Sequence, residues 1–177
     1  MKVTSANENI EIMRNAFAAL ARKDIDTCIS FMTPDFIINL AGVPYQMRGP
    51  DAWRKNAEIF FKAFPDIKFV EEDMFASGDR VAVRFRFTGT HNGDFLGNAA
   101  TGKKVSYDSY EFYRIADGKI AEEWISSDML TILTQIGAFP PHQLIAMYLS
   151  GYRVWFAAIL GLAAGAVAAL TLGSMFS

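Results

Sequence analysis

The stretch RVAVRFRFTGT at residues 80–90 decides the fold. Its apolar side chains recur at every second position from Val81 to Phe87, and Arg84 and Arg86 occupy positions between them. Successive side chains of a β-strand point to opposite faces. The stretch therefore predicts a strand with one face packed in a core and the other face in solvent.

Similar runs lie on both sides of this strand. We expect strands at 67–75, 103–115 and 119–127, and the short turns SGD and ADG between runs are typical of hairpins. The loop at 91–102 is longer and contains glycine and asparagine. A further strand-like run lies at 36–40.

Helix signals precede and follow these strands. Thr4 or Ser5 can cap a first helix, Asp24 can cap a short second helix, and Pro50 suits the first turn of a third helix. A last short helix is expected at 128–136. This order predicts an α+β fold, in which the N-terminal helices pack on one face of a strongly curved antiparallel sheet and enclose a pocket.

Composition excludes several classes of function. The 177 residues include 17 basic and 19 acidic side chains, which gives a net charge of −2, and the basic residues are scattered. We therefore expect no nucleic-acid partner. The single cysteine, Cys28, excludes an internal disulfide. Only two histidines are present, about fifty residues apart, so we expect no zinc site, and the sequence contains no phosphate-loop or nucleophile-elbow motif.

The C-terminal region differs from the rest. Residues 154–172 read VWFAAILGLAAGAVAALTL and contain no charge. About 20 such residues in a helix cover roughly the 30 Å core of a bilayer. We expect a domain at 1–137, a linker or interfacial segment at 138–153 and a transmembrane helix at 154–174. The alternative is a helix buried in an oligomer. Arg153 places the domain on the cytoplasmic side by the positive-inside rule.

Seven short motifs follow one another along the chain. They are GPDAW (49–53), FPD (64–66), GDRV (78–81), GTHxGxFxG (89–97), TGK (101–103), DGKI (117–120) and W-x3-D-x-L (124–130). In this order they resemble the SnoaL-like polyketide cyclases and ester cyclases of the NTF2-like superfamily, over roughly residues 8–137. The resemblance implies a cone-shaped fold with a deep apolar pocket, frequent dimers and no cofactor. Members catalyse cyclisation, isomerisation or epoxide opening, and others only bind.

The resemblance also implies site residues. Four positions match residues of the family pattern: Trp53, His91, Trp124 and Asp128. Cyclases of the anthracycline type resemble one another in having an acidic residue directly after this tryptophan and a histidine on the preceding strand. Here these positions are Ile125 and Glu111. One carboxylate is therefore expected to face an aliphatic side chain.

Three residues are candidates for proton transfer. Glu111 lies among aromatic residues, and apolar surroundings raise the pKa of a carboxyl group into the range of a general acid or base. Its alternative role is an ion pair with Arg84 or Arg86. His91 is a candidate because histidine titrates near neutral pH, and its alternative role is to order the long loop. Asp128 is a candidate at the pocket mouth, and its alternative role is a helix cap.

A pocket for a lipophilic small molecule is expected between the sheet and the helices. Its predicted lining residues are Tyr45, Trp53, Arg84, Tyr107 and Trp124. Tyrosines or Arg84 would orient a carbonyl group. Tyr107 lies on the opposite face of its strand from Asp108 and Tyr110, and the sequence leaves open which of the two faces looks inward.

Together these features predict a membrane-anchored, cofactor-free cyclase, isomerase or hydratase that acts on a polyketide-like or isoprenoid-like molecule. The alternative is a membrane-tethered module of the same fold that binds a ligand or dimerises without chemistry. Small residues recur every four positions in the apolar segment and include Gly161 and Gly165. Such a stripe lets two helices approach closely, which predicts a homodimer.

Overall fold

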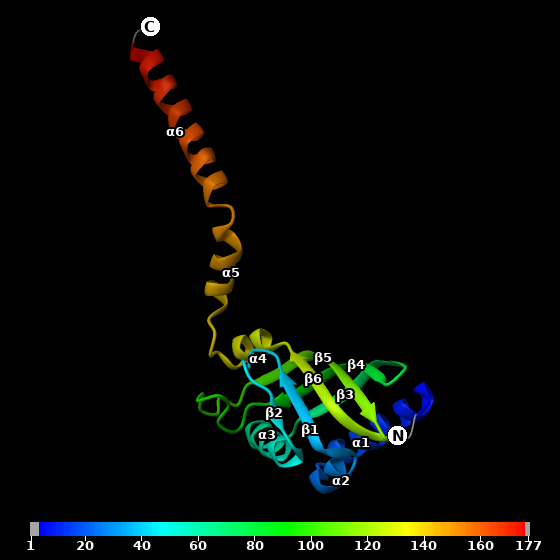
Figure 1. Ribbon diagram of the computed structural model, residues 1–177. Coiled ribbons are helices and arrows are strands. Elements are labelled where there is room, and N and C mark those ends of the chain that lie inside the picture. Colours follow the sequence, from blue (N-terminus) through cyan, green and yellow to red (C-terminus); the bar gives the residue numbers. More distant parts are fainter. Residues whose placement is uncertain (1–3, 176–177) are drawn as a thin grey trace. The chain divides into compact units, whose positions relative to one another are not determined.

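The computed structural model describes residues 4–175, which divide into one unit up to Ala138 and another from Phe139 onward. The first unit contains α1 (Ala6–Ala21), α2 (Ile25–Ser30), β1 (Met32–Leu40), β2 (Met47–Arg48), α3 (Pro50–Ala63), β3 (Lys68–Ser77), β4 (Arg80–Thr90), β5 (Lys104–Ala116), β6 (Lys119–Ser127) and α4 (Met129–Ile136) (Figure 1). The strands at 80–90 and 119–127 have the predicted bounds.

The N-terminal helices begin where their capping residues predict. The Ser5 hydroxyl accepts a hydrogen bond from the Glu8 N–H at 3.3 Å, and the Glu8 carboxylate accepts one from the Ser5 N–H at 2.7 Å. This reciprocal capping box satisfies two amides at the start of α1. Asp24 caps α2 by accepting the Thr27 N–H at 3.1 Å, and Pro50 is the first residue of α3.

The described residues form a six-stranded sheet in the order β2-β1-β6-β5-β4-β3. We predicted an antiparallel sheet, but the pairing of β1 with β6 is parallel. No hairpin joins these two strands, so no short turn imposes an antiparallel direction on them. β1 also begins four residues earlier than predicted. Its pairing with β6 is irregular between Met32 and Ile37, and this irregularity accommodates Pro34, which has no N–H to donate.

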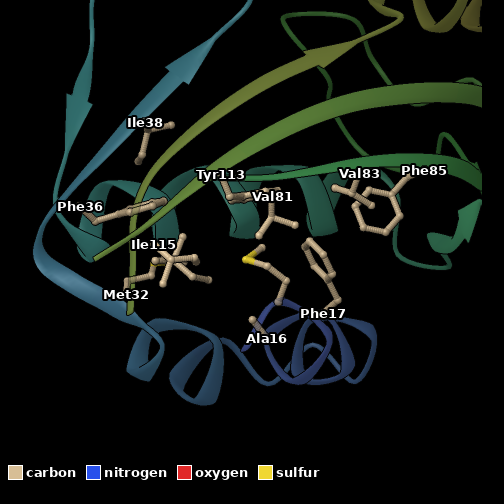
Figure 2. Packing of buried hydrophobic residues seen from close by; sticks show 12 residues of the cluster. Ala16, Phe17, Met32, Phe36, Ile38, Val81, Val83, Phe85, Tyr113 and Ile115 are labelled. Atoms are coloured by element: carbon tan, nitrogen blue, oxygen red, sulfur yellow. The ribbon is translucent and has the colours of Figure 1, made fainter. Parts of the chain in front are cut away.

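Helices α1 to α3 lie on one side of the curved sheet (Figure 1). One core cluster joins α1 to the inner face of the sheet. Figure 2 shows Ala16 and Phe17 of α1 across from Val81, Val83 and Phe85 of β4. The Phe17 and Phe85 rings meet edge to face with centroids 4.7 Å apart. The apolar face predicted for residues 81–87 is therefore confirmed as the buried face.

A second core cluster lies around the C-terminal end of α3 and includes α4. It is formed by Ala63, Phe64, Ile67, Phe95, Val105, Tyr107, Ile132 and Ile136. α4 ends at Gly137, whose φ of 88° lies in the left-handed region that favours glycine. The chain thus leaves the first unit directly after this cluster.

The second unit contains α5 (Pro141–Ser150) and α6 (Arg153–Met175). The interval at 138–153, predicted as a linker or interfacial piece, contains the helix α5. This helix is short. Pro140 precedes it and Pro141 is its first residue, a position that tolerates proline because the missing N–H would have no helical partner there. In α6, residues Arg153–Leu170 have a mean hydropathy of 1.9 and none of this stretch is buried. By length and composition this helix can cross a membrane.

Candidate active site

A cavity of about 550 Å³ lies between the helices and the inner face of the sheet. This volume is within the range of small-molecule sites. Phenylalanine side chains from the helices, the sheet and the 91–102 loop supply much of its wall: Phe17, Phe36, Phe60, Phe61, Phe69, Phe85, Phe87 and Phe95. The predicted apolar pocket is therefore present.

Few polar side chains interrupt this wall. Among the described residues that line the cavity they are Cys28, Trp53, Asn56, Tyr107, Glu111, Tyr113, Glu123 and Ser127. Two of these are carboxylates, and none of the described lining residues is lysine, arginine or histidine. The acid–base groups available at this wall are therefore carboxyl and hydroxyl groups and one thiol.

Glu111 lies on β5 and points inward with Tyr107, Ser109 and Tyr113. The face of β5 that carries Tyr107 is therefore the inner face. Only 6% of Glu111 is exposed. The Ser109 hydroxyl donates a hydrogen bond to one carboxylate oxygen at 2.8 Å, and the Tyr113 hydroxyl donates to the other oxygen. Burial raises the pKa of Glu111 above 4.5, and these two hydrogen bonds act in the opposite direction.

Glu123 on β6 is a second buried carboxyl group, with 3% of its surface exposed. It pairs across the strands with Tyr113. Burial raises its pKa well above 4.5, the nearby Glu111 raises it further, and a hydrogen bond with Trp53 lowers it. Glu123 is not among the site residues predicted from the sequence. Alternation along β6 could have identified it, because Glu123 lies two positions before Ile125 and therefore shares its inward-facing side of the strand.

The neighbouring hydroxyl and thiol groups are held in their protonated forms. Burial, with the charges of Glu111 and Glu123, raises the pKa of Tyr113 well above 10.0. Burial and Glu111 also raise the pKa of Tyr107, whose ring stacks on Phe87 with centroids 5.2 Å apart. Burial raises the pKa of the Cys28 thiol to about 11, so this thiol is not a reactive nucleophile near neutral pH.

The structure confirms the expectation that the Glu111 carboxylate faces the aliphatic side chain of Ile125. The two residues are direct partners in the β5–β6 pairing, and both line the cavity. The alternative role of Glu111, an ion pair with Arg84 or Arg86, is not observed. Arg86 instead pairs with Asp108 on the outer face of the sheet.

His91 is fully buried but lies outside the set of residues that line the cavity. Its Nδ1 is 3.0 Å from the Thr101 hydroxyl, and its carbonyl accepts the N–H groups of Thr101 and Gly102. The ring packs beside Phe64 at 5.5 Å between centroids. Its contacts are those of a residue that orders the 91–102 loop, because they join the two ends of this loop.

Asp128 is also placed away from the cavity wall. Its carboxylate accepts the Thr131 N–H at 3.0 Å and the Thr131 hydroxyl at 2.6 Å. These contacts cap α4. The alternative role as a helix cap is therefore the one for which the structure supplies partners.

Of the five predicted pocket residues, Trp53 and Tyr107 line the cavity. Arg84 lies on the outer face, because it alternates with inward residues of β4, and it pairs with Asp73 at 2.7 Å. Trp124 also faces outward. The Arg80 guanidinium lies 4.9 Å from its ring centre. Tyr45 is 66% exposed in the turn between β1 and β2. The prediction that Arg84, Trp124 and Tyr45 line the pocket is therefore wrong.

Comparison with known proteins agrees with this architecture. Residues 10–136 match the model of the SnoaL-like polyketide cyclase family. Aklanonic acid methyl ester cyclase DnrD of Streptomyces peucetius is 30% identical over 93 residues, which are 52% of this chain and 64% of that protein. Aklanonic acid methyl ester cyclase DauD of Streptomyces sp. strain C5 is 26% identical over 131 residues, 72% of this chain and 81% of that protein. The match to DnrD thus spans slightly under two thirds of its length.

Solved structures share the fold. AclR of Streptomyces galilaeus superimposes with a TM-score of 0.70 at 32% identity, over 77% of this chain and 100% of that one. A SnoaL-like protein of Jannaschia sp. CCS1 gives a TM-score of 0.68 at 26% identity, over 79% and 100% of the two chains. The domain that encloses the cavity therefore has known structural relatives, and the chain belongs to the SnoaL-like polyketide cyclase family.

Proposed function

We propose that this protein is a cofactor-free cyclase that closes a carbon ring in a lipophilic polycarbonyl compound, with Glu111 as its base. One observation carries this proposal. A buried carboxyl group, oriented by two hydroxyl donors, lies in the wall of an apolar cavity of small-molecule size. Such a group is suited to take and return a proton, because burial raises its pKa above 4.5.

The same observation favours an enzyme over a binding module. Burying a carboxyl group without a cationic partner destabilises a fold. A binding module would gain nothing from this arrangement, whereas an acid–base catalyst requires it. The names of DnrD and DauD as cyclases support the same interpretation.

The cavity also indicates a class of substrate. Its walls are apolar, and the described lining residues include no cation that would pair with a carboxylate or phosphate. A neutral polycarbonyl ester therefore fits better than a free acid. The relatives DnrD and DauD act, by their names, on aklanonic acid methyl ester, in which an acid group is esterified.

The proposed reaction is an intramolecular aldol addition. Ionised Glu111 removes a proton from a carbon beside a carbonyl group, and the resulting enolate carbon attacks a second carbonyl of the same molecule. Tyr107 offers a hydroxyl group at the wall for a carbonyl oxygen. The aromatic walls hold the flexible substrate in a folded conformation, which supplies much of the rate through proximity.

Ring closure is tested with the full chain in maltoside micelles and aklanonic acid methyl ester, together with related polycarbonyl esters. The product is an isomer of the substrate, so it is followed by chromatography and absorbance. Glu111→Gln should lower kcat by about 10²- to 10⁴-fold, the usual contribution of one acid–base group. Asp108→Asn, on the outer face of the same strand, is the control and should keep the rate. Full activity of Glu111→Gln, or no wild-type turnover of any ester, would contradict the proposal.

We infer further that α6 anchors the enzyme in a membrane with the domain on the cytoplasmic side, and that the spans pair as a homodimer. The length and hydropathy of α6 support the anchor. A side chain added at Gly161 or Gly165 would meet open space, so these positions leave room for a second helix. Replacing both glycines by isoleucine should weaken self-association of the span in a membrane two-hybrid assay, and an unchanged signal would argue against pairing there.

A further inference from the structure

The two buried carboxyl groups lie next to each other on paired strands. Glu111 of β5 is opposite Ile125 of β6, and Tyr113 of β5 is opposite Glu123. Glu111 and Glu123 are therefore diagonal neighbours on one face of the sheet, a relation in which the residues lie roughly 7–8 Å apart. Tyr113 connects them, because it is the cross-strand partner of Glu123 and its hydroxyl donates to Glu111.

Nearby cations are directed away from this pair. On the outer face of the sheet Arg84 pairs with Asp73, and Arg114 pairs with Glu122. The titratable groups among the described cavity-lining residues are Cys28, Tyr107, Glu111, Tyr113 and Glu123. Two carboxylates in a low-dielectric site without a cation resist being ionised together.

Their hydrogen-bond partners make the two carboxyl groups unequal. Glu111 accepts hydrogen bonds from Ser109 and Tyr113, and both bonds favour its ionised form. Glu123 has one such hydrogen bond, with Trp53, and feels the charge of Glu111. Glu111 should therefore lose its proton first as the pH rises, and its charge then holds the proton on Glu123.

We propose that Glu123 is the general acid of the cyclisation and donates the proton that the new alkoxide requires. Glu111 takes a proton from carbon, the C–H electron pair forms the C–C bond, and the electron pair of the second carbonyl moves to its oxygen. The oxygen then takes the proton of Glu123. The cycle ends with Glu111 protonated and Glu123 ionised, and exchange with water restores both after the product leaves. This inference rests on the proposed cyclase function.

The order of ionisation can be measured without a substrate. Infrared spectra of the full chain in maltoside micelles record the C=O band of a protonated carboxylic acid, which shifts in D₂O. The Glu123→Gln variant retains the band of Glu111, and the Glu111→Gln variant retains the band of Glu123. The Glu111 band should disappear at the lower pH of the two. Glu122→Gln, the adjacent outward-facing residue, is the matched control and should leave the band unchanged. The reverse order, equal midpoints or the absence of a band in the wild type would overturn the assignment.

Kinetics with a turned-over ester supply the second test. The wild-type rate should rise with pH as Glu111 ionises and fall as Glu123 ionises. Glu123→Gln should lower kcat by about 10²- to 10⁴-fold and remove the alkaline fall. An unchanged kcat and alkaline limb would overturn the role of Glu123. If Glu123→Gln fails to fold, Glu123→Met keeps the volume and should show the same loss. Failure of the cyclase proposal would appear as no wild-type turnover, and the infrared order of ionisation would still be readable.

Discussion

At the scale of single residues, Glu111 and Glu123 are the costly feature of this fold. Each occupies a buried position where an apolar residue would pack without desolvating a charge. Ser109, Tyr113 and Trp53 offset part of this cost through hydrogen bonds. A site of this kind is stable with neutral acids and is strained when both acids are ionised.

This strain predicts how stability depends on pH. Because burial raises both pKa values above 4.5, the folded state holds protons that the unfolded chain has already lost. The stabilisation is complete below the unfolded pKa and is lost as the pH rises through the folded pKa values. The free energy of unfolding should fall by about 1.4 kcal/mol per pH unit for each proton concerned.

The measurement is the thermal midpoint of the full chain, followed by tryptophan fluorescence from mildly acidic to alkaline pH. In the double variant Glu111→Gln and Glu123→Gln this decline should flatten, because neither amide titrates. An equally steep decline in the double variant would show that other groups cause it.

At the level of secondary-structure elements, variants of Asp128 distinguish a structural role of this residue from a catalytic role. Asp128→Ala removes the cap of α4 and should destabilise the fold by about 1 kcal/mol, with the activity per folded molecule unchanged. Asp128→Asn keeps a capping side chain and should stay near wild-type stability. Chemical denaturation with a parallel activity assay checks both variants. A loss of activity in Asp128→Asn without a loss of stability would restore Asp128 as a candidate acid.

Much of the architecture could be predicted from local patterns. The alternation at 80–90, the cap at Ser5 and Pro50 at the start of α3 are local signals, and the structure agrees with them. The parallel pairing of β1 with β6 joins segments far apart in the chain, and no local pattern records it.

The site was less predictable, because it depends on which face of each strand looks inward. Along β5 and β6 both sets of alternating residues contain apolar and polar side chains, so alternation does not say which set is buried. Trp124 was therefore expected in the pocket and lies on the outer face. Arg84 was also expected there, but it alternates with the apolar residues of β4 and lies on the outer face. Glu123 was overlooked in a run that reads as two adjacent charged residues, EE, of which only the second points into the cavity.

For the whole molecule, the division into two units at Ala138 predicts that the first unit is soluble by itself and that the full chain associates with a membrane. A chain that ends at Ala138 retains both core clusters and should be soluble and folded. The full chain should stay with the membrane fraction after a carbonate wash, because α6 is apolar over the length of a bilayer core. Release of the full chain by this wash would remove the anchor from the account.

The proposed role of Glu111 requires that its carboxylate removes a proton from carbon inside the cavity. The most direct measurement uses an ester that carries the acidic C–H group but lacks the second carbonyl, so that it cannot cyclise. Exchange of this hydrogen in D₂O is then followed by NMR. The wild type and Glu123→Gln should accelerate the exchange, and Glu111→Gln should not. Exchange by Glu111→Gln at the wild-type rate would contradict this role.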